Sequence, residues 1–327
     1  MEKLSLYVPK LVQKFEKFAP GHRACIGCGE ALAVRMAFKA IGRNVIVANA
    51  TGCMEIVASQ LPNITWEVPW IHTLFENTSA VASGVEAAYK VMRRKGLGEL
   101  PEGTKIVAIG GDGGTSDIGI QSLSGAMERG HDFTYICFDN EGYMNTGTQR
   151  SSATPFGART TTSPPGKKSI GQFSWKKDMP AIAAAHNIPY VATATPSYPF
   201  DMMEKVAKAV ATPGPAYVHV LSVCPNGWGT ANAMTVRMGR LAVECGMFPL
   251  YEIENGTYKM SLDLPKLRPV TDYLKPQVRF RHLSDDNVKK IQARVELEYQ
   301  KLLEKAENGS KKSKGNRKTD TAKKSER

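Results

Sequence analysis

The chain has 327 residues, of which 42% are hydrophobic and 8% aromatic, as is usual for a globular protein. No stretch approaches the roughly 20 apolar residues of a membrane-spanning helix. The N-terminal sequence MEKLSLYVPKLVQKFEKF lacks the unbroken apolar core of a secretory signal. We therefore expect a cytoplasmic protein that makes no membrane contact. The length admits one or two domains, and one domain with appended segments is the simpler arrangement.

The formal net charge of +12 at first suggests nucleic-acid binding, but half of it lies at one end of the chain. Residues 308–327 contain eight Lys or Arg, two acidic residues and no apolar side chain larger than alanine. Such a segment cannot bury apolar surface, so we predict a disordered basic tail. The rest of the chain carries only about +6, and we expect no nucleic-acid partner.

Short β-rich segments alternate with segments of helical periodicity along most of the chain. The clearest strands are VIVANA (45–50), KIVAIG (105–110), FTYICF (133–138) and AYVHVLSV (216–223). Strands that alternate with helices at this spacing predict an α/β fold, a parallel sheet with helices on both faces. The nearly continuous apolar character of the two middle segments is typical of strands buried on both sides.

Helical periodicity is clear after Cys28, where an apolar side precedes a stop at Gly42. Asp117 is a candidate N-cap of a helix that ends at Gly130. Further helices are expected over 78–96, 180–187 and 283–306. Residues 146–175 are rich in Gly, Ser, Thr and Pro, and a loop of this length is usually functional or mobile.

These patterns suggest four segments. They are an N-terminal extension (1–20), an α/β domain (21–240), a C-terminal extension that packs on the domain or on a partner subunit (241–307), and the basic tail (308–327). The α/β domain contains every turn that carries candidate chemistry.

Six cysteines in a chain expected in the cytosol point to metal binding or catalysis, because the cytosol keeps thiols reduced. Cys137 and Cys245 lie in apolar runs and are predicted core residues. The other four lie in turns rich in glycine or proline: Cys25, Cys28, Cys53 and Cys224. A CxxC pair is compatible with zinc, a redox dithiol or an iron–sulfur cluster, and its spacing alone does not decide between them.

Candidate functional segments follow the predicted strands directly. Cys53, Cys224, the GDGG turn (111–114) and the DNEGYMN segment (139–145) each come after one of the four strands. Parallel strands share a carboxyl edge, where the ligand crevices of open α/β sheets form. The sequence therefore predicts one composite site, built from segments spread over about 170 residues.

The GDGG turn has the composition of an anion-binding turn. Three glycines let the backbone approach a phosphate and leave N–H groups free to point at its oxygens: Gly111, Gly113 and Gly114. Asp112 would hold magnesium, joined by the Asn140 amide oxygen, 28 residues further on, and by the Gly142 carbonyl. A GDG followed at this spacing by a strand that ends in Asn resembles the diphosphate-binding motif of thiamine enzymes. A four-cysteine site beside such a cofactor has a use as an electron acceptor, although structural zinc remains an alternative.

The order of the motifs gives a more specific resemblance. CIGCGE, NATGC, GDGGTSDIG, DNEGYMNTG and SVCP occur as in the β subunits of 2-oxoacid:ferredoxin oxidoreductases, and the similarity spans about residues 19–230. NTGTQRSSATP looks most like the pyruvate members of that family. The resemblance implies the thiamine-diphosphate-binding fold of these subunits.

The resemblance also implies the chemistry. Thiamine diphosphate attacks the keto carbon of pyruvate, carbon dioxide leaves, and coenzyme A takes the acyl group to give acetyl-CoA. A [4Fe–4S] cluster accepts the electrons one at a time and passes them to ferredoxin. By this resemblance the cluster ligands are Cys25, Cys28, Cys53 and Cys224, and the magnesium ligands are Asp112, Asn140 and the Gly142 carbonyl. Asn145 is expected near the thiazolium and the substrate, and Glu30 is a candidate neighbour of the site.

Partners are implied as well. Thiamine enzymes need a glutamate from a pyrimidine-binding domain, for which a chain of 327 residues leaves little room. We therefore expect a separate α subunit that supplies the glutamate, together with γ and δ subunits of ferredoxin type. Two alternatives stay open: the same chemistry on 2-oxoisovalerate or 2-oxoglutarate, and a zinc-stabilised, non-redox, thiamine-dependent decarboxylase subunit.

Overall fold

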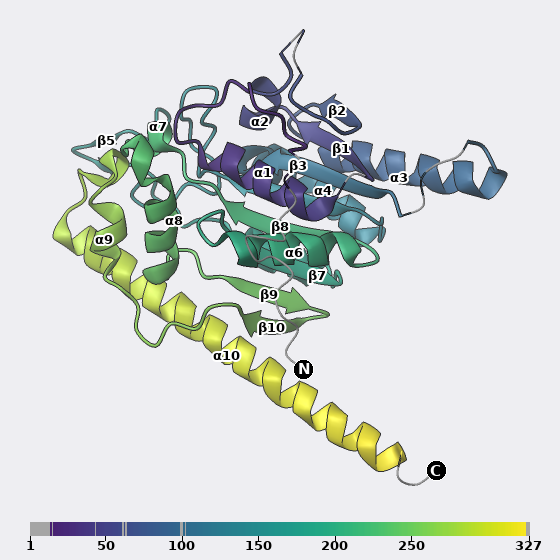
Figure 1. Cartoon of the computed structure of the whole chain (residues 1–327). Coiled ribbons are helices and arrows are strands. Elements are labelled where there is room, and N and C mark those ends of the chain that lie inside the picture. Colours follow the sequence, from purple (N-terminus) through teal and green to yellow (C-terminus); the bar gives the residue numbers. More distant parts are fainter. Residues whose placement is uncertain are drawn as a thin grey trace.

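The computed structural model describes residues 14, 16–42, 44–60, 62, 64–98, 101 and 103–324, with side chains up to residue 309. Within the expected N-terminal extension, residues 1–13 and 15 lie outside the described residues. The described part contains an eight-stranded sheet with the strand order β10-β9-β7-β8-β4-β3-β1-β2 (Figure 1). Helices cover both faces of this sheet, so the predicted α/β class is confirmed.

The elements of the sheet and its helices have the following bounds. The strands are β1 Val45–Ala50, β2 Trp70–Thr73, β3 Lys105–Gly111, β4 Thr134–Asp139, β7 Tyr190–Ala194, β8 Ala216–Leu221, β9 Tyr251–Glu254 and β10 Thr257–Met260; a small hairpin pairs β5 Pro165–Gly166 with β6 Ser169–Ile170. The helices are α1 Gly29–Ile41, α2 Cys53–Ile56, α3 Thr78–Lys95, α4 Ile120–Glu128, α5 Met179–Ala185, α6 Pro199–Ala211, α7 Pro225–Trp228, α8 Thr235–Glu244, α9 Val270–Leu274 and α10 Asp285–Lys324.

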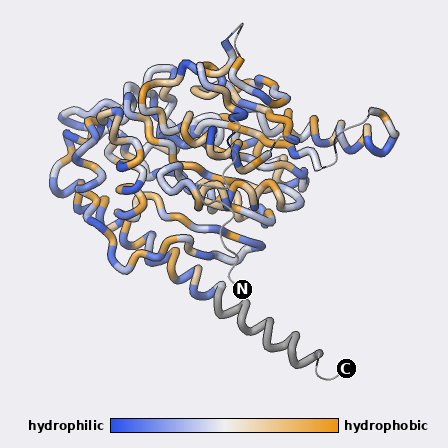
Figure 2. The backbone as a smooth tube through the Cα atoms, viewed as in Figure 1, coloured by the Kyte–Doolittle hydropathy of each residue, from blue (hydrophilic) through white to orange (hydrophobic). Residues whose placement is uncertain are grey.

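The strands predicted from sequence form the middle of the sheet. β1, β3, β4 and β8 pair in parallel, and β2 and β7 extend the parallel part on either side. Every residue of β4 and of β8 is buried, as expected for strands covered on both faces. Hydrophobic residues are concentrated along these strands (Figure 2).

Two helical layers close the core. Buried residues of α1 and α6 pack on one face, against side chains such as Val107 and Val218. Buried residues of α3, α4 and α5 pack on the other face, against side chains such as Ala108 and Tyr217. A third cluster joins α8, α9 and α10 to the loop around Phe156. The predicted core residues Cys137 and Cys245 are both buried.

One edge of the sheet differs from the prediction of a purely parallel sheet. β9 pairs antiparallel with β7, and β10 pairs antiparallel with β9. Asn255 and Gly256, both with positive φ, form the turn between them. An Asn-Gly pair between alternating strands is a strong hairpin signal, and it was present in the sequence.

Asp117 does not cap a helix, contrary to the prediction. It lies in a π-helical turn, Gly114–Ile118, and α4 starts only after Gly119. Its carboxylate accepts hydrogen bonds from the backbone N–H and hydroxyl of Ser152, which lies far along the chain. Gly130 follows the helix with positive φ, as predicted.

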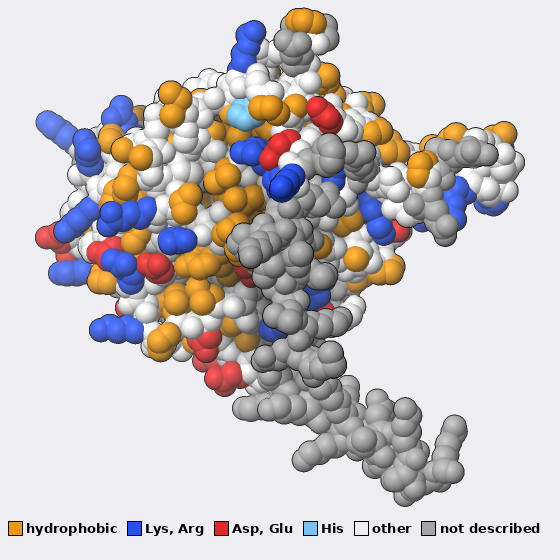
Figure 3. Space-filling model, viewed as in Figure 1, with side chains coloured by type: hydrophobic (Ala, Val, Ile, Leu, Met, Phe, Trp, Pro, Cys, Tyr) orange, Lys and Arg blue, Asp and Glu red, His pale blue; other side chains and the backbone are white. Residues whose placement is uncertain are grey.

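The C-terminal helix is longer than the predicted 283–306. α10 runs Asp285–Lys324 and so includes backbone for which the sequence predicts a disordered tail (Figure 1). Lysine and alanine have good helix propensity, which is compatible with helix even where no apolar side chain is available for packing. On the face shown in Figure 3, basic side chains are interspersed with acidic and apolar ones. Among the described helices, none is long and apolar enough to cross a membrane.

Candidate active site

A narrow cleft lies at the carboxyl edge of β1, β3 and β4. Its lining consists of Glu30, Thr51, Gly52, Cys53, Phe75, Gly111, Asp112, Gly113, Gly114, Asn140, Gly142, Tyr143, Met144, Asn145 and Thr146. The cleft therefore brings together the GDGG turn, the segment after β4 and one of the candidate cluster cysteines. The parallel register explains this convergence, because Gly111 at the end of β3 pairs with Phe138 near the end of β4.

Asp112 provides a buried carboxylate in this cleft. Its side chain is 1% exposed, and its Oδ2 accepts a hydrogen bond from the Ser151 hydroxyl at 2.5 Å. Burial and the negative charge of Asp139 raise the pKa of Asp112 well above its usual value. A cation beside Asp112 would counter both effects, as expected for a carboxylate that binds a metal.

Asn140 presents an amide oxygen to the same cleft. Its Nδ2 donates to Glu30 Oε2 at 3.0 Å, and among the described residues its buried Oδ1 has no hydrogen-bond partner. Because Glu30 accepts from the amino side, the oxygen side of the amide is left for another ligand. An unpaired buried acceptor is costly, so it indicates a group that the protein alone does not provide. Burial raises the pKa of Glu30 to about 7.

The turn after Asn140 adds two further groups. The Gly142 carbonyl accepts the Met144 N–H at 3.0 Å and keeps a second lone pair. Asn145 is exposed and lines the outer part of the cleft. The structure thus places Asp112, Asn140, Gly142 and Asn145 around one cleft.

Close packing fixes the GDGG turn against this segment. The Tyr143 ring lies so near Gly113 that a Cβ added there would be 2.3 Å from a ring atom. The Tyr143 hydroxyl donates to the Gly113 carbonyl at 3.1 Å and to the Asp117 carboxylate at 3.2 Å. Only glycine fits at position 113 without moving the tyrosine.

The long loop over residues 146–175 folds back onto the site. Ser151 binds Asp112, and Ser152 binds Asp117, as described above. The Thr154 hydroxyl donates to the Glu141 carbonyl at 2.9 Å. These hydrogen bonds connect the loop both to the GDGG turn and to the segment after β4. The loop must be long to reach both parts of the cleft.

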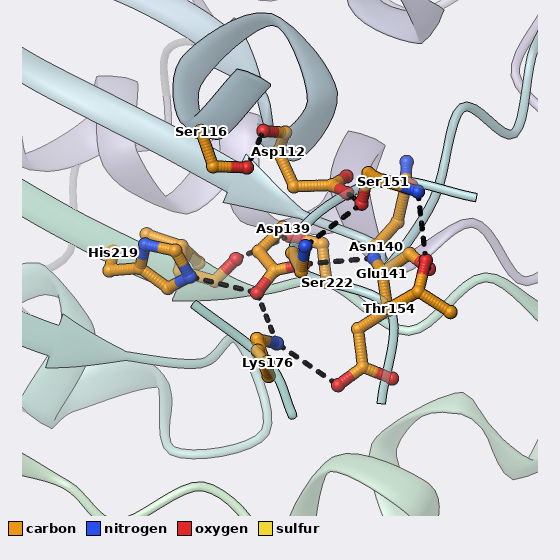
Figure 4. Close-up of polar contacts among 12 residues, drawn as sticks. Asp112, Ser116, Asp139, Asn140, Glu141, Ser151, Thr154, Lys176, His219 and Ser222 are labelled. Atoms are coloured by element: carbon orange, nitrogen blue, oxygen red, sulfur yellow. Dashed lines mark hydrogen bonds and ion pairs between the residues drawn. The ribbon is translucent and has the colours of Figure 1, made fainter. Parts of the chain in front are cut away.

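Sequence reasoning missed a buried charge network behind the cleft (Figure 4). Asp139 accepts from His219 Nε2 at 2.8 Å and forms an ion pair with Lys176. Lys176 also pairs with Glu141 at 3.1 Å, and Glu141 pairs with Arg279 at 2.5 Å. Burial alone would raise the pKa of Asp139, but Lys176 and His219 outweigh it and hold that pKa well below its usual value. Positive φ at the non-glycine residue Glu141 was not foreseeable from a local pattern.

Three of the four cluster candidates lie in the segments that lead into α1 and α7, and Cys53 begins α2 and lines the cleft. The Sγ of Cys28 accepts the Ala31 N–H at 3.4 Å at the start of α1. The Sγ of Cys224 accepts the Gly227 N–H at 3.3 Å at the start of α7. The two loops touch, because the Gly29 N–H donates to the Val223 carbonyl at 3.0 Å.

Electrostatics show that these thiols are neighbours. Burial raises the pKa of Cys53 far above its usual value, and charge on Glu30 or on any of the other three cysteines raises it further. Burial also raises the pKa of Cys28 to about 12 and that of Cys224 to a lesser extent. Within the part of the chain that the structure describes, no three Cys, His, Asp or Glu side chains come close enough to hold a single metal ion. The thiols are therefore gathered in one region without converging on one point.

A comparison with protein families shows the broad class to which the chain belongs. Residues 50–220, more than half of the chain, match the family described as "Thiamine pyrophosphate enzyme, C-terminal TPP binding domain". This region includes the GDGG turn and the segment after β4. The fold is thus that of a thiamine-diphosphate-binding domain.

Curated relatives show the family within this class. The chain is 55% identical to pyruvate synthase subunit PorB of Methanocaldococcus jannaschii, over 86% of this chain and 94% of that protein. It is 44% identical to ketoisovalerate oxidoreductase subunit VorB of Pyrococcus abyssi, over 89% of this chain and 94% of that protein. The chain therefore belongs to the family of PorB subunits among the 2-oxoacid:ferredoxin oxidoreductases.

A solved structure supports the fold. The 2-oxoglutarate:ferredoxin oxidoreductase of Magnetococcus marinus superposes with a TM-score of 0.54 at 19% identity. The match covers 89% of this chain and 97% of that one. At this identity the likeness shows a shared fold alone.

Proposed function

We propose that this chain is the β subunit of a cytoplasmic pyruvate:ferredoxin oxidoreductase. The complex converts pyruvate and coenzyme A to acetyl-CoA and carbon dioxide, and the two electrons pass singly to ferredoxin. The observation that carries the proposal is the shared cleft, in which Asp112, Asn140 and Asn145 lie beside Cys53. Thiamine diphosphate, when bound, supplies the nucleophilic carbon and the electron sink for decarboxylation.

The donor set of the cleft fits a magnesium ion that bridges to a diphosphate. Magnesium prefers oxygen ligands and is usually held by one or two protein oxygens together with phosphates and waters. The Asp112 carboxylate, the unpaired Oδ1 of Asn140 and the Gly142 carbonyl would hold it. The backbone of the GDGG turn would contact the diphosphate, and Asn145 would contact the substrate at the outer part of the cleft.

The composition of the cysteine site fits a [4Fe–4S] cluster, which takes four thiolate ligands. A structural zinc ion can also take four thiolates, but it has no redox chemistry to offer beside thiamine diphosphate. Cys25, Cys28, Cys53 and Cys224 would hold it, and the N–H groups of Ala31 and Gly227 would donate to its thiolates, which tunes such a cluster.

The size of the cleft supports a partner subunit. It encloses only about 30 Å³, whereas sites that hold a cofactor usually enclose about 300–1,000 Å³. This chain therefore supplies one wall of the site, and an α subunit would supply the other wall together with the glutamate for the aminopyrimidine. Ferredoxin-type γ and δ subunits would carry electrons onward from the cysteine loops.

Exposed apolar side chains beside the cleft have the character of such an interface. Ile56 ends α2, Ile71 lies on the edge strand β2, and Leu74 follows it; their exposed fractions are 43%, 45% and 59%. Leu74 adjoins Phe75, and α2 begins at Cys53, so the apolar surface borders the cleft lining. Exposed apolar groups next to a half-built site mark a surface for a protein partner.

Anaerobic purification tests the proposal. The complex should contain about four iron and four sulfide per copy of this chain at the cysteine site and should reduce ferredoxin only with pyruvate, coenzyme A and thiamine diphosphate present. The chain alone should keep its iron and show no turnover. A colourless chain that contains zinc, in a complex that releases acetaldehyde without coenzyme A, would instead support the decarboxylase alternative.

Substrate choice needs its own measurement, because the relatives include both a pyruvate synthase and a ketoisovalerate oxidoreductase. We expect kcat/KM to be highest for pyruvate when pyruvate, 2-oxoisovalerate and 2-oxoglutarate are compared under one set of conditions. A preference for either other acid would keep the chemistry and change the substrate.

A further inference from the structure

The turn over residues 139–142, which connects β4 to the cleft, has an unusual backbone. Glu141 adopts φ +70 although it is not a glycine, and it stands between the candidate metal ligands Asn140 and Gly142. A bulky residue reaches this conformation only when its surroundings fix it there. Its buried carboxylate, 5% exposed as a residue, shows what fixes it.

Two cations hold the two oxygens of Glu141 from different sides. Lys176 Nζ lies 3.1 Å from Oε1, and Arg279 Nη2 lies 2.5 Å from Oε2. Lys176 also binds Asp139, whose Oδ1 accepts the Glu141 N–H at 2.8 Å. Side chain and backbone of Glu141 are therefore fixed by the same network.

Arg279 reaches the turn by a second route. Its guanidinium stacks on the Trp228 ring, with Cζ 4.1 Å from the ring centroid. Trp228 in turn donates its Nε1–H to the Asn140 carbonyl at 2.8 Å. Gln277 accepts from Arg279 Nε at 2.8 Å and fixes the orientation of the guanidinium. One arginine thus supports the residue that precedes Glu141 as well as Glu141 itself.

We propose that Arg279 and Lys176 are positioning residues for the proposed magnesium and diphosphate site. They hold Glu141 so that the Asn140 amide oxygen and the Gly142 carbonyl face one ion from the same turn. The inference rests on the proposed function and extends it, since neither residue is among those that line the cleft. Groups behind metal ligands commonly set the orientation and the affinity of a site.

Arg279 lies outside the region that matches the thiamine-enzyme family. The thiamine-enzyme match ends at residue 220, and Arg279 lies in the segment that follows α9. The C-terminal part of the chain would therefore complete the cofactor domain from outside the matched region. Trp228, which joins Arg279 to Asn140, also lies beyond the match.

The test measures thiamine diphosphate binding to the anaerobic complex as a function of Mg²⁺, by calorimetry. In Arg279→Met the Mg²⁺ concentration for half-maximal binding should rise about tenfold or more, and the melting temperature is measured on the same sample. Arg268→Met is the matched control, because Arg268 makes exposed ion pairs with Glu244 and Asp272 in the same C-terminal region. It should keep the wild-type Mg²⁺ requirement.

A double-mutant cycle with Glu141→Gln separates positioning from general destabilisation. If Arg279 acts through Glu141, the two substitutions have strongly non-additive effects on the Mg²⁺ requirement. A wild-type Mg²⁺ requirement in Arg279→Met, or strictly additive effects, overturns the inference even if the melting temperature falls.

If Arg279→Met does not fold, Arg279→Lys and Glu141→Gln are judged by the same measurement. A wild-type complex that binds thiamine diphosphate without Mg²⁺ overturns the proposed function itself.

Discussion

The two proposed cofactor sites of this chain are built in opposite ways. The 139–142 turn and Asp112 are buried and held by ion pairs and hydrogen bonds from distant parts of the chain. The cysteine site is more open: Cys25 is exposed, the neighbouring Ile26 is 79% exposed, and the other three cysteines stand at the starts of α1, α2 and α7. The magnesium site is thus organised by the protein, whereas the geometry of the cysteine site depends on the cluster that it would hold.

This difference has a physical basis. Oxygen ligands for magnesium must be held in nearly ideal geometry before the ion arrives, because magnesium gives up its waters reluctantly. Thiolate–iron bonds are strong enough to order the loops that provide them. We therefore expect substitutions at one site to leave the other largely intact, and the following variants test that separation.

Removing a cluster ligand should have the largest effect. Cys53→Ser should lose most of the iron, and its rate of ferredoxin reduction should fall. The fall should exceed ~100-fold, the upper range for replacing a residue that lies behind a metal ligand. Thiamine diphosphate should still bind, since Asp112 and Asn140 are untouched. Iron analysis and calorimetry on the same sample measure both. Cys245→Ser is the control, because this buried thiol lies outside the cleft and donates to the Pro269 carbonyl. Loss of both cofactors in Cys53→Ser would break the separation.

Asp112→Asn should be nearly as severe at the other site. The amide keeps the shape of the side chain but loses the negative charge, so Mg²⁺ affinity should fall by at least the ~100-fold that loss of an outer partner can cost. The cluster should stay, as measured by its visible absorption and electron paramagnetic resonance. A colourless Asp112→Asn protein would contradict independent assembly of the two sites.

Ser151→Ala removes one support behind Asp112 and should have a smaller effect. The Ser151 hydroxyl donates to Asp112 at 2.5 Å, and losing such a partner should weaken Mg²⁺ binding by about tenfold. Titration of activity with Mg²⁺ at saturating thiamine diphosphate measures the change. The matched variant Ser169→Ala, on the β6 hairpin, should titrate like the wild type.

Glu252→Gln should have the smallest effect and should change neither cofactor site. Burial would raise the pKa of Glu252, but hydrogen bonds from Lys208 (2.7 Å) and Tyr190 (3.0 Å) help to lower it. The variant should lose about 1 kcal/mol of unfolding free energy at neutral pH. Because the pKa of Glu252 is lowered in the folded state, its ionised carboxylate stabilises the fold at pH values above the unfolded-state pKa of about 4.3. This stabilisation is lost as the pH falls through the pKa of the folded state. Urea unfolding at pH 7 and pH 3.5 should show the difference shrinking in acid, and an equal difference at both would exclude this origin.

The parts of the site that follow strands could be predicted from the sequence. β3 and β4 are largely apolar and were therefore predicted as strands, and parallel pairing brings Asp112 and Asn140 to one edge of the sheet. The same reasoning placed Cys53 after β1. Local patterns were sufficient here because the carboxyl ends of parallel strands lie next to one another at the same edge of the sheet.

The supports behind the site could not be predicted in this way. Lys176 and Arg279 reach Glu141 across 35 and 138 residues, and no local pattern encodes such a contact. Asp117 illustrates the opposite error. Its local sequence predicts a helix N-cap, but its carboxylate accepts hydrogen bonds from Ser152 instead. Long-range partners decided the role of both carboxylates.

The Glu30–Asn140 hydrogen bond limits how far the two sites can be separated by design. Glu30 lies in the first turn of α1, two residues after Cys28, and its carboxylate accepts the Asn140 amino group at 3.0 Å. A transplant of the GDGG and 139–146 segments onto another α/β scaffold would leave this acceptor behind. Asn140 could then turn its amino group toward the metal, so an engineered magnesium site would need the cysteine helix or a substitute acceptor in its place.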